Sequence, residues 1–380
     1  MPEFREGMST LIKTINRYIS LQSKIKNYEL AGNVNKSGSN KSIAKMSLET
    51  QLLETTEIVF VTLGSSGSTA LTNSNKFEVV IIDEAAQSVE PSSLVALRLG
   101  RHHCVLVGDP QQLPATVFSK SGRNLKYDRS LFQRLEEGGN KVYMLNQQYR
   151  MHPHISKFPR EIFYKNNLFD GENVLKRTYA AELQGVLALG CPDLKPFTII
   201  NLNSSEERRG VSLSNSDEAN LCLHLVKTLT GGKLGNMDFR SRIGIIAPYA
   251  EQVSLLRRTF SSKNSNNSDI ETVSIKKQFD VEINSVDGFQ GREKDIIIFS
   301  AVRAGSEGSG IGFLADVRRM NVALTRAKKM MIIICDCERI SVNELWRELI
   351  NRAKEQHVIL DAGSNTQFDF TAGQGLTNVE

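Results

Sequence analysis

The chain has 380 residues, of which 40% are hydrophobic and 23% charged, a composition ordinary for a globular protein with more than one hydrophobic core. No apolar run reaches the length of about 18 residues that a membrane helix needs, and the first residues lack an apolar signal core, so neither a membrane span nor secretion is expected. The net charge is +5, and residues 1–50 hold eight Lys or Arg against four Asp or Glu, which fits a phosphate-binding leader and fits a solvated surface equally well.

Residues 1–49 are predicted to form a leader. Apolar side chains at helical spacing over 8–26 predict one amphipathic helix, and the polar residues 33–43 predict a flexible linker. The cysteines of the chain are odd in number and follow no zinc-binding or disulfide spacing, so reduced thiols are expected. They are Cys104, Cys191, Cys222, Cys335 and Cys337.

From residue 58 onward, short apolar runs alternate with helical patterns. Runs that are apolar on both faces are typical of parallel strands covered by helices on two sides. The chain is therefore predicted to be an α/β protein with two domains and mostly parallel sheets. The predicted strands are 58–62, 79–82, 105–107, 198–202, 243–247, 281–286, 296–300 and 330–334.

A turn-rich segment, Glu137-Gly138-Gly139-Asn140, separates the first three strands from the others. It predicts a boundary between a first domain over 50–140 and a second over 141–362. A surface loop is expected over 261–272, and a disordered tail over 363–380.

The first chemical motif follows the strand 79–82, which ends in Asp83 and Glu84. Carboxyl ends of parallel strands face the ligand crevice of an open sheet. Asp83 is then placed to hold Mg²⁺ through water, and Glu84 to orient or deprotonate an attacking water. Alternatively, both acids cap the following helix.

Two further polar segments follow strands or precede helices in the same region. Gln112 lies in Gly108–Pro114, where its amide could contact a γ-phosphate or water, although an Asp-Pro turn explains the segment equally well. Arg150 offers a guanidinium fork suited to phosphate, and Tyr149 offers a ring face to a base. A structural salt bridge is the alternative for Arg150.

The last two motifs lie near the strands at 281 and 330. In 284–295, Gly291 permits close backbone approach to a ligand, and Glu293 could accept a ribose hydroxyl. Residues 318–328 predict a helix that leads into a strand, with Arg326 directed towards a cleft where it would neutralise phosphate charge. A basic helix face is the alternative.

In this order, the segments DEAAQ, GDPQQLP, QQYRMHP, DGFQGREKD and RRMNVALTRAK resemble motifs II to VI of superfamily 1 helicases of the up-frameshift/senataxin-like (MAGATAMA-like) group. The resemblance covers about residues 50–355. It implies two RecA-like domains that bind ATP and Mg²⁺ and move 5′ to 3′ on single-stranded RNA or DNA. Asp83, Glu84, Gln112, Arg150 and Arg326 would be catalytic, with Tyr149, Gly291 and Glu293 contacting the nucleotide.

The segment 55–67 is similar to the part of this family that contacts nucleic acid, so Thr62 is expected to touch the strand, as is Ser285 in motif V. The senataxin-like character favours the nucleus, and the up-frameshift alternative favours the cytoplasm.

A phosphate-binding loop of the form G-x-x-x-x-G-K-S/T does not occur in the sequence; Gly231-Gly232-Lys233 is followed by Leu234 and lies after motif II. The first domain is therefore expected to be incomplete, and this chain to be weak or inactive alone. Two hypotheses stay open: the carboxy-terminal portion of an ATP-dependent helicase, or a non-catalytic nucleic-acid-binding or scaffold protein on a degenerate helicase fold.

Overall fold

The computed structural model describes residues 49–74, 76–183, 187, 193–230, 241–261, 280–305, 310–362 and 377–378. The helix predicted over 8–26, the linker over 33–43, nearly all of the loop over 261–272 and Cys191 lie outside these residues. So does the disordered tail predicted over 363–380, except at 377–378, where the prediction is wrong because these two residues form a short strand. The described chain forms two compact units. The first contains residues up to Pro110 and Pro114–Val142, and the second contains Gln111–Leu113 and the residues from Tyr143 onward.

The first unit is built around two parallel strands, β1 (Phe77–Ile82) and β2 (Gly100–Leu106), with Ile82 opposite Leu106. Helix α4 (Glu90–Leu97) connects the strands and packs on them. The other elements of this unit are η1 (Ser65–Gly67), α3 (Thr69–Asn73), η2 (Ala85–Gln87), α5 (Lys120–Asn124) and α6 (Leu131–Glu137).

The strand predicted over 58–62 is wrong. These residues join no ladder among the described parts of the chain, and Phe60 is 88% exposed. An apolar segment becomes a strand only where a neighbouring strand satisfies its backbone groups, and the ladder that β1 forms is with β2. The strands predicted at 79–82 and 105–107 fall on β1 and the end of β2.

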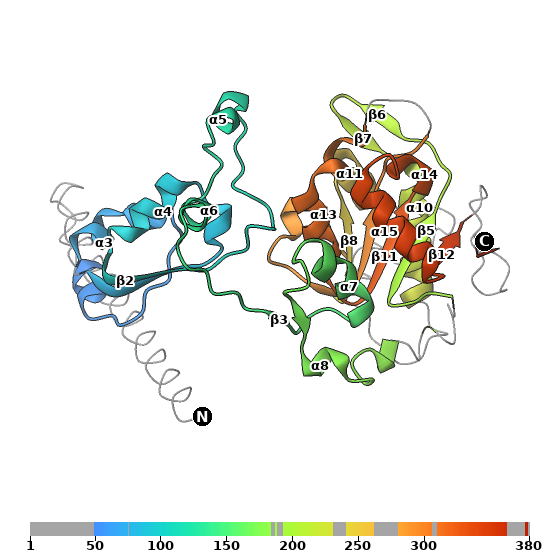
Figure 1. The fold of residues 1–380 in the computed structure, drawn as a ribbon. Helices are drawn as coiled ribbons and strands as arrows, with labels where there is room; N and C mark the ends of the chain where they lie inside the picture. The colour runs from blue at the N-terminus through green and yellow to red at the C-terminus, as the bar shows by residue number, and fades with distance from the viewer. Residues whose placement is uncertain are drawn as a thin grey trace, which may run out of the picture. The chain divides into compact units, whose positions relative to one another are not determined.

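The second unit contains a seven-stranded sheet with the order β13-β12-β5-β11-β10-β8-β9 (Figure 1). Neighbouring strands are parallel except at β12 and β13, which confirms the predicted α/β class. The strands are β5 (Phe197–Asn201), β8 (Ile243–Ala247), β9 (Glu282–Ser285), β10 (Lys294–Ser300), β11 (Ala327–Cys335), β12 (Ile359–Asp361) and β13 (Thr377–Asn378), and five of them were predicted.

Helices cover both faces of this sheet (Figure 1). Along β10, Ile297 and Phe299 pack on one side, and Ile296 and Ile298 pack on the other. All four side chains are buried, which explains why the run is apolar without alternation. The first face is covered by α7 (Pro153–Ile162), α13 (Val317–Leu324), α14 (Cys337–Ile340) and α15 (Glu344–Glu355), and the second by α10 (Ser216–Thr230) and α11 (Ala250–Thr259).

Several short elements complete the second unit. A two-residue parallel ladder joins β3 (Gln147–Gln148) to β4 (Phe169–Asp170), and a hairpin joins β6 (Glu207–Arg209) to β7 (Ser212–Ser214). The remaining elements are α8 (Glu172–Leu175), η3 (Asp287–Phe289) and η4 (Gly312–Ala315). No helix within the described ranges combines the length and the apolar character that crossing a bilayer requires.

Candidate functional site

Asp83 and Glu84 follow the carboxyl end of β1 in the first unit, and both are exposed. The Asp83 carboxylate accepts a 2.9 Å hydrogen bond from the Glu84 N–H, and the amide of Gln87 donates to the Glu84 carboxylate. Neither acid caps a helix through its side chain, and the N-cap of α4 is Val89. Glu84 adopts a left-handed conformation with φ 52°, which is uncommon for a residue with a side chain and recurs at functional turns.

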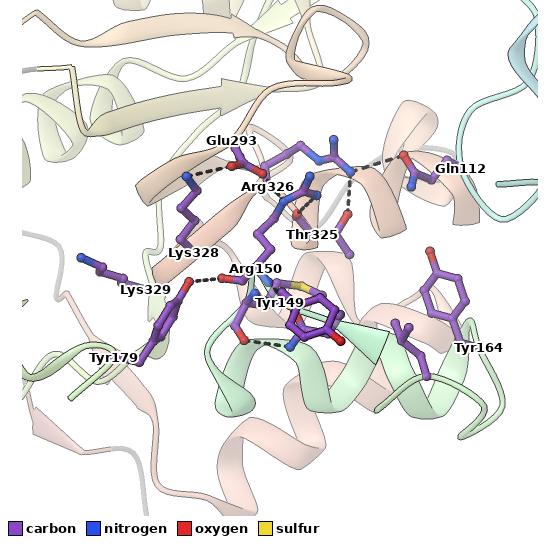
Figure 2. Close-up of a pocket in the computed structure, with 13 residues that line it drawn as sticks. Gln112, Tyr149, Arg150, Tyr164, Tyr179, Glu293, Thr325, Arg326, Lys328 and Lys329 are labelled. Atoms are coloured by element: carbon purple, nitrogen blue, oxygen red, sulfur yellow. Dashed lines mark hydrogen bonds and ion pairs between the residues drawn. The ribbon is translucent and has the colours of Figure 1, made fainter. Parts of the chain in front are cut away.

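In the second unit, a cavity of about 630 Å³ opens beside motifs IV and VI (Figure 2). Five of the predicted site residues line this cavity: Gln112, Tyr149, Arg150, Glu293 and Arg326. Tyr149 is exposed to solvent. The other lining residues are Gln148, Met151, Tyr164, Leu168, Tyr179, Thr325, Lys328 and Lys329. Residues scattered over more than two hundred positions of sequence therefore meet at one cavity.

Glu293 is held between two cations in this cavity. Its carboxylate forms ion pairs with the Arg150 guanidinium and, at 2.7 Å, with the Lys328 ammonium (Figure 2). Burial raises the pKa of Glu293, but the hydrogen bond from Lys328 and the charge of Arg150 outweigh burial and bring that pKa below its ordinary value. Glu293 is therefore an ionised acceptor, and its single negative charge can neutralise only one of the two cations that it contacts.

The turn that carries Arg150 is fixed by Gln148. The Gln148 side-chain oxygen accepts from the N–H groups of Arg150 at 3.0 Å and Met151 at 2.7 Å, and its amide donates to Asp170 at 2.6 Å. Tyr179 donates from its hydroxyl to the Arg150 carbonyl. Because these bonds hold the backbone on both sides, the guanidinium projects from a rigid base.

Arg326 is the second arginine of the cavity that is suited to binding phosphate, and this residue is 2% exposed. Its guanidinium donates to the Val322 carbonyl at 2.9 Å. It also donates to the Thr325 hydroxyl at 3.0 Å and to the Gln112 side-chain oxygen at 3.3 Å (Figure 2). A buried guanidinium needs such acceptors because it stays charged. The helix predicted over 318–328 is confirmed only in its first part, because α13 ends at Leu324, two residues before this arginine, and Ala327 and Lys328 already belong to β11.

Three predicted site residues lie elsewhere. Gly291 has φ +71° in an exposed turn and does not line the cavity. The Ser285 hydroxyl, at the end of β9, accepts from the Gly288 N–H at 3.1 Å. In the first unit, the Thr62 hydroxyl donates to Ser65 at 3.0 Å and accepts from the Ser65 N–H, so its observed contacts are those of a local turn.

Sequence reasoning missed Lys328, Gln148 and Tyr179. Lys328 lies at the start of β11, two positions after Arg326, and residues two positions apart in extended chain tend to face the same side, so this spacing carried a signal for Lys328. Gln148 stood inside the quoted motif, and its role depends on Asp170, which lies 22 positions later. Tyr179 belongs to no pattern that the sequence offers.

Two arginines and two lysines around an open cavity are cationic donors suited to an anionic ligand, and the ionised carboxylate of Glu293 is an acceptor suited to a hydroxyl group on the same ligand. A nucleoside polyphosphate has this composition. Asp83, as a single exposed carboxylate, fits Mg²⁺, which keeps most of its water and binds through one or two carboxylates.

Two family models described as AAA domains match residues 12–120 and 127–338. A probable helicase of Dictyostelium discoideum is 42% identical over 329 residues, covering 85% of this chain and 32% of that protein. Helicase SEN1 of Saccharomyces cerevisiae is 38% identical over 328 residues, covering 86% and 14%. The ATP-dependent helicase upf1 of Schizosaccharomyces pombe is 33% identical over 373 residues, covering 93% and 38%.

The chain thus spans from 14% to 38% of the length of these relatives. The family resemblance seen in the motifs is confirmed, because one AAA domain model matches more than half of the chain and the relatives align over most of it. The chain belongs to the superfamily 1 helicases of the up-frameshift/senataxin group, whose RecA-like domains bind ATP.

Proposed function

We propose that this chain is the carboxy-terminal motor portion of an ATP-dependent helicase that moves 5′ to 3′ along single-stranded RNA or DNA. The observation that carries the proposal is the convergence of Gln112, Arg150, Glu293 and Arg326 on one cavity of the second unit. A scaffold released from ATP hydrolysis has no need to keep Gln112 in hydrogen-bond contact with a buried Arg326. The three relatives are all helicases by name, which supports the same proposal.

Each residue then has a role of its own. Arg150 and Arg326 neutralise the charge that spreads over the phosphoryl oxygens as the terminal phosphate is transferred. Glu293 accepts from a ribose hydroxyl, and Gln112 senses the terminal phosphate through its link to Arg326. In the first unit, Asp83 holds the hydrated Mg²⁺ and Glu84 orients the attacking water.

The sequence contains no G-x-x-x-x-G-K-S/T loop to hold the β- and γ-phosphates. We therefore expect these 380 residues alone to hydrolyse ATP weakly, and a longer chain that supplies such a loop to hydrolyse it readily. The alternative is a non-catalytic nucleic-acid-binding scaffold on the same fold. Location in the nucleus stays a prediction, which imaging of a tagged full-length protein tests.

The decisive experiment measures ATP hydrolysis and RNA binding by the 380-residue chain, with and without single-stranded RNA, and repeats both on a longer chain that carries a phosphate-binding loop. RNA binding by both chains, with RNA-stimulated hydrolysis in the longer one, supports the motor. RNA binding without hydrolysis in either chain favours the scaffold. RNA-stimulated hydrolysis by the shorter chain would show that another group replaces the loop lysine.

A further inference from the structure

Phe313, in η4 of the second unit, is a large aromatic side chain that is 50% exposed. Its ring is not loose on the surface. The ring of buried Tyr249 meets it edge to face, with centroids 5.6 Å apart, and the Arg319 guanidinium carbon lies 5.0 Å from its centre. One part of the ring is therefore fixed by two neighbours while another part faces solvent.

The backbone below this ring is also constrained. The Tyr249 hydroxyl donates to the Ile311 carbonyl at 3.2 Å, and Gly312 has φ +57°. A Cβ atom at Gly312 would lie 2.8 Å from that hydroxyl, so a side chain at this position would be strained on both counts. Leu314 is buried and its carbonyl accepts from the Trp346 indole at 2.8 Å. Phe313 is thus presented between two anchored residues.

The ring lies at the carboxyl edge of the sheet. Ala247 of β8 is paired with Ser285 of β9, and Tyr249 and Asp287 each follow their strand by two residues. Arg319 joins the two because it pairs with Asp287 at 3.3 Å and lies over Phe313. Open α/β sheets bind ligands at this edge.

The ion pairs of Arg319 indicate which ligand chemistry fits. Arg319 is paired with Asp287 at 3.3 Å and with Asp316 at 3.4 Å, so its charge is matched by two carboxylates. The cluster therefore offers an aromatic surface rather than a phosphate-binding cation. Unpaired nucleobases are the flat, apolar-faced ligands that stack on such side chains without regard to sequence.

We propose that Phe313 is a stacking platform for an unpaired base of the single-stranded nucleic acid, with Tyr249 and Arg319 as positioning residues. This inference rests on the proposed function and deepens it, because it names a contact with the base itself. Stacking on one aromatic ring is worth about 1–3 kcal/mol, which corresponds to about five- to 150-fold in affinity.

The test measures binding of a fluorescein-labelled oligouridine strand to the full 380-residue chain by fluorescence anisotropy, over a series of salt concentrations. Phe313→Ala is compared with Phe313→Trp and with Phe169→Ala, which removes a phenylalanine of matched exposure, 51%, from β4. An abasic strand of equal length keeps the phosphates but removes the bases. Thermal unfolding checks that each variant is folded.

The expected result is an affinity loss of about five- to 150-fold for Phe313→Ala on oligouridine, none on the abasic strand, and an unchanged slope of log affinity against log salt. Phe313→Trp restores binding and Phe169→Ala leaves it intact. If the wild type binds oligouridine and Phe313→Ala binds it equally well, Phe313 is not a stacking platform, but the proposed function still stands. A reduced salt slope overturns it in favour of a phosphate contact, and no binding by the wild type overturns both proposals.

Discussion

The guanidinium of Arg326 donates to the side-chain oxygen of Gln112 at 3.3 Å, although 214 positions separate the two residues in the chain. Arg326 is also tied to the Val322 carbonyl and the Thr325 hydroxyl of its own turn. A movement of the Gln112 side chain would therefore change the hydrogen bonding of the buried Arg326 guanidinium, which lies just after α13. This contact gives motif III a physical connection to motif VI within the second unit.

Arg326→Ala is expected to act on both stability and turnover. It removes the donor that satisfies buried acceptors, which costs roughly 1–3 kcal/mol of unfolding free energy. In a longer chain with a phosphate-binding loop, it should lower ATP hydrolysis on the order of a thousandfold with little loss of RNA affinity. Urea unfolding measures the unfolding free energy, phosphate release measures ATP hydrolysis, and anisotropy measures RNA affinity.

The control is Arg347→Ala, which removes an exposed arginine. Normal ATP hydrolysis by Arg326→Ala would contradict the role assigned to this arginine.

Glu84→Gln is expected to separate binding of ATP from its hydrolysis. The substitution keeps the size of the side chain but removes the carboxylate that orients the attacking water or accepts its proton. ATP turnover should therefore fall about a hundredfold or more. Nucleotide affinity should be unchanged or higher. Equilibrium binding and phosphate release on the longer chain measure both. As a control, Glu78→Gln removes an exposed acid of β1 and should change neither nucleotide affinity nor turnover. Equal losses of turnover in both variants would contradict the role of Glu84 in orienting the attacking water.

The fold of the second unit could be predicted from the sequence because its strands are buried on both faces. Ile297 and Ile298 point to opposite sides, yet both are fully buried, so the apolar run itself marks the strand. At Ile58–Thr62 the same composition misled, since apolar character does not supply a hydrogen-bonding partner. The short strand β12 was missed because three residues give no readable period.

The site could be predicted where a motif names the residue, as at Arg150 and Glu293, but their partnership could not. The two side chains are 143 positions apart, and the ion pair depends on how the turn after β3 meets the turn before β10. The sequence also assigned Gln112 to the first domain, whereas the structure places it with the second unit. Only packing determines such a placement.

Glu293→Gln is expected to weaken recognition of the ribose. The carboxylate is an ionised acceptor at ordinary pH because Lys328 and Arg150 outweigh the effect of burial on its pKa. A neutral amide accepts a hydroxyl hydrogen bond less strongly, so the preference for ATP over 2′- and 3′-deoxy analogues should drop about tenfold. Competition binding with the three nucleotides measures the preference. If all three lost affinity equally, Glu293 would be acting on the phosphates through its two cations.

Gly171→Ala is expected to displace Tyr149 from the cavity. A Cβ atom at Gly171 would overlap the Tyr149 ring, which is 58% exposed and can move away, and would lie 3.1 Å from the Gln148 carbonyl oxygen, which must shift slightly. Nucleotide affinity should fall to the level of Tyr149→Ala, while the melting temperature changes little. Tyr149→Phe keeps the ring and removes only the hydroxyl that donates to Gln147, so it should bind normally. Normal binding by Gly171→Ala and Tyr149→Ala would remove Tyr149 from the nucleotide site.

Glu218, in the first turn of α10, is expected to make the stability of the protein depend on pH. The side chain is fully buried, and burial raises its pKa to about 8, although hydrogen bonds from the Ser300 hydroxyl and the Val302 N–H act in the opposite direction. Because the folded pKa lies above the ordinary value of 4.5, the native state holds its proton more tightly than the unfolded chain does. This contribution to stability is complete below about 4.5 and is lost as the pH rises towards about 8.

Glu218→Gln should remove this dependence, because a glutamine amide stays neutral and its carbonyl can still accept from Val302. The unfolding free energy of the wild type should decline by up to about 1.4 kcal/mol for each pH unit within that window, and the decline should be shallower in the variant. Urea unfolding across the window, followed by circular dichroism, measures both slopes. Glu355→Gln, at an exposed acid of α15, should keep the wild-type slope. Identical slopes in Glu218→Gln and the wild type would mean that Glu218 is ionised in the native state, and that Ser300 and Val302 stabilise its charge more than burial opposes it.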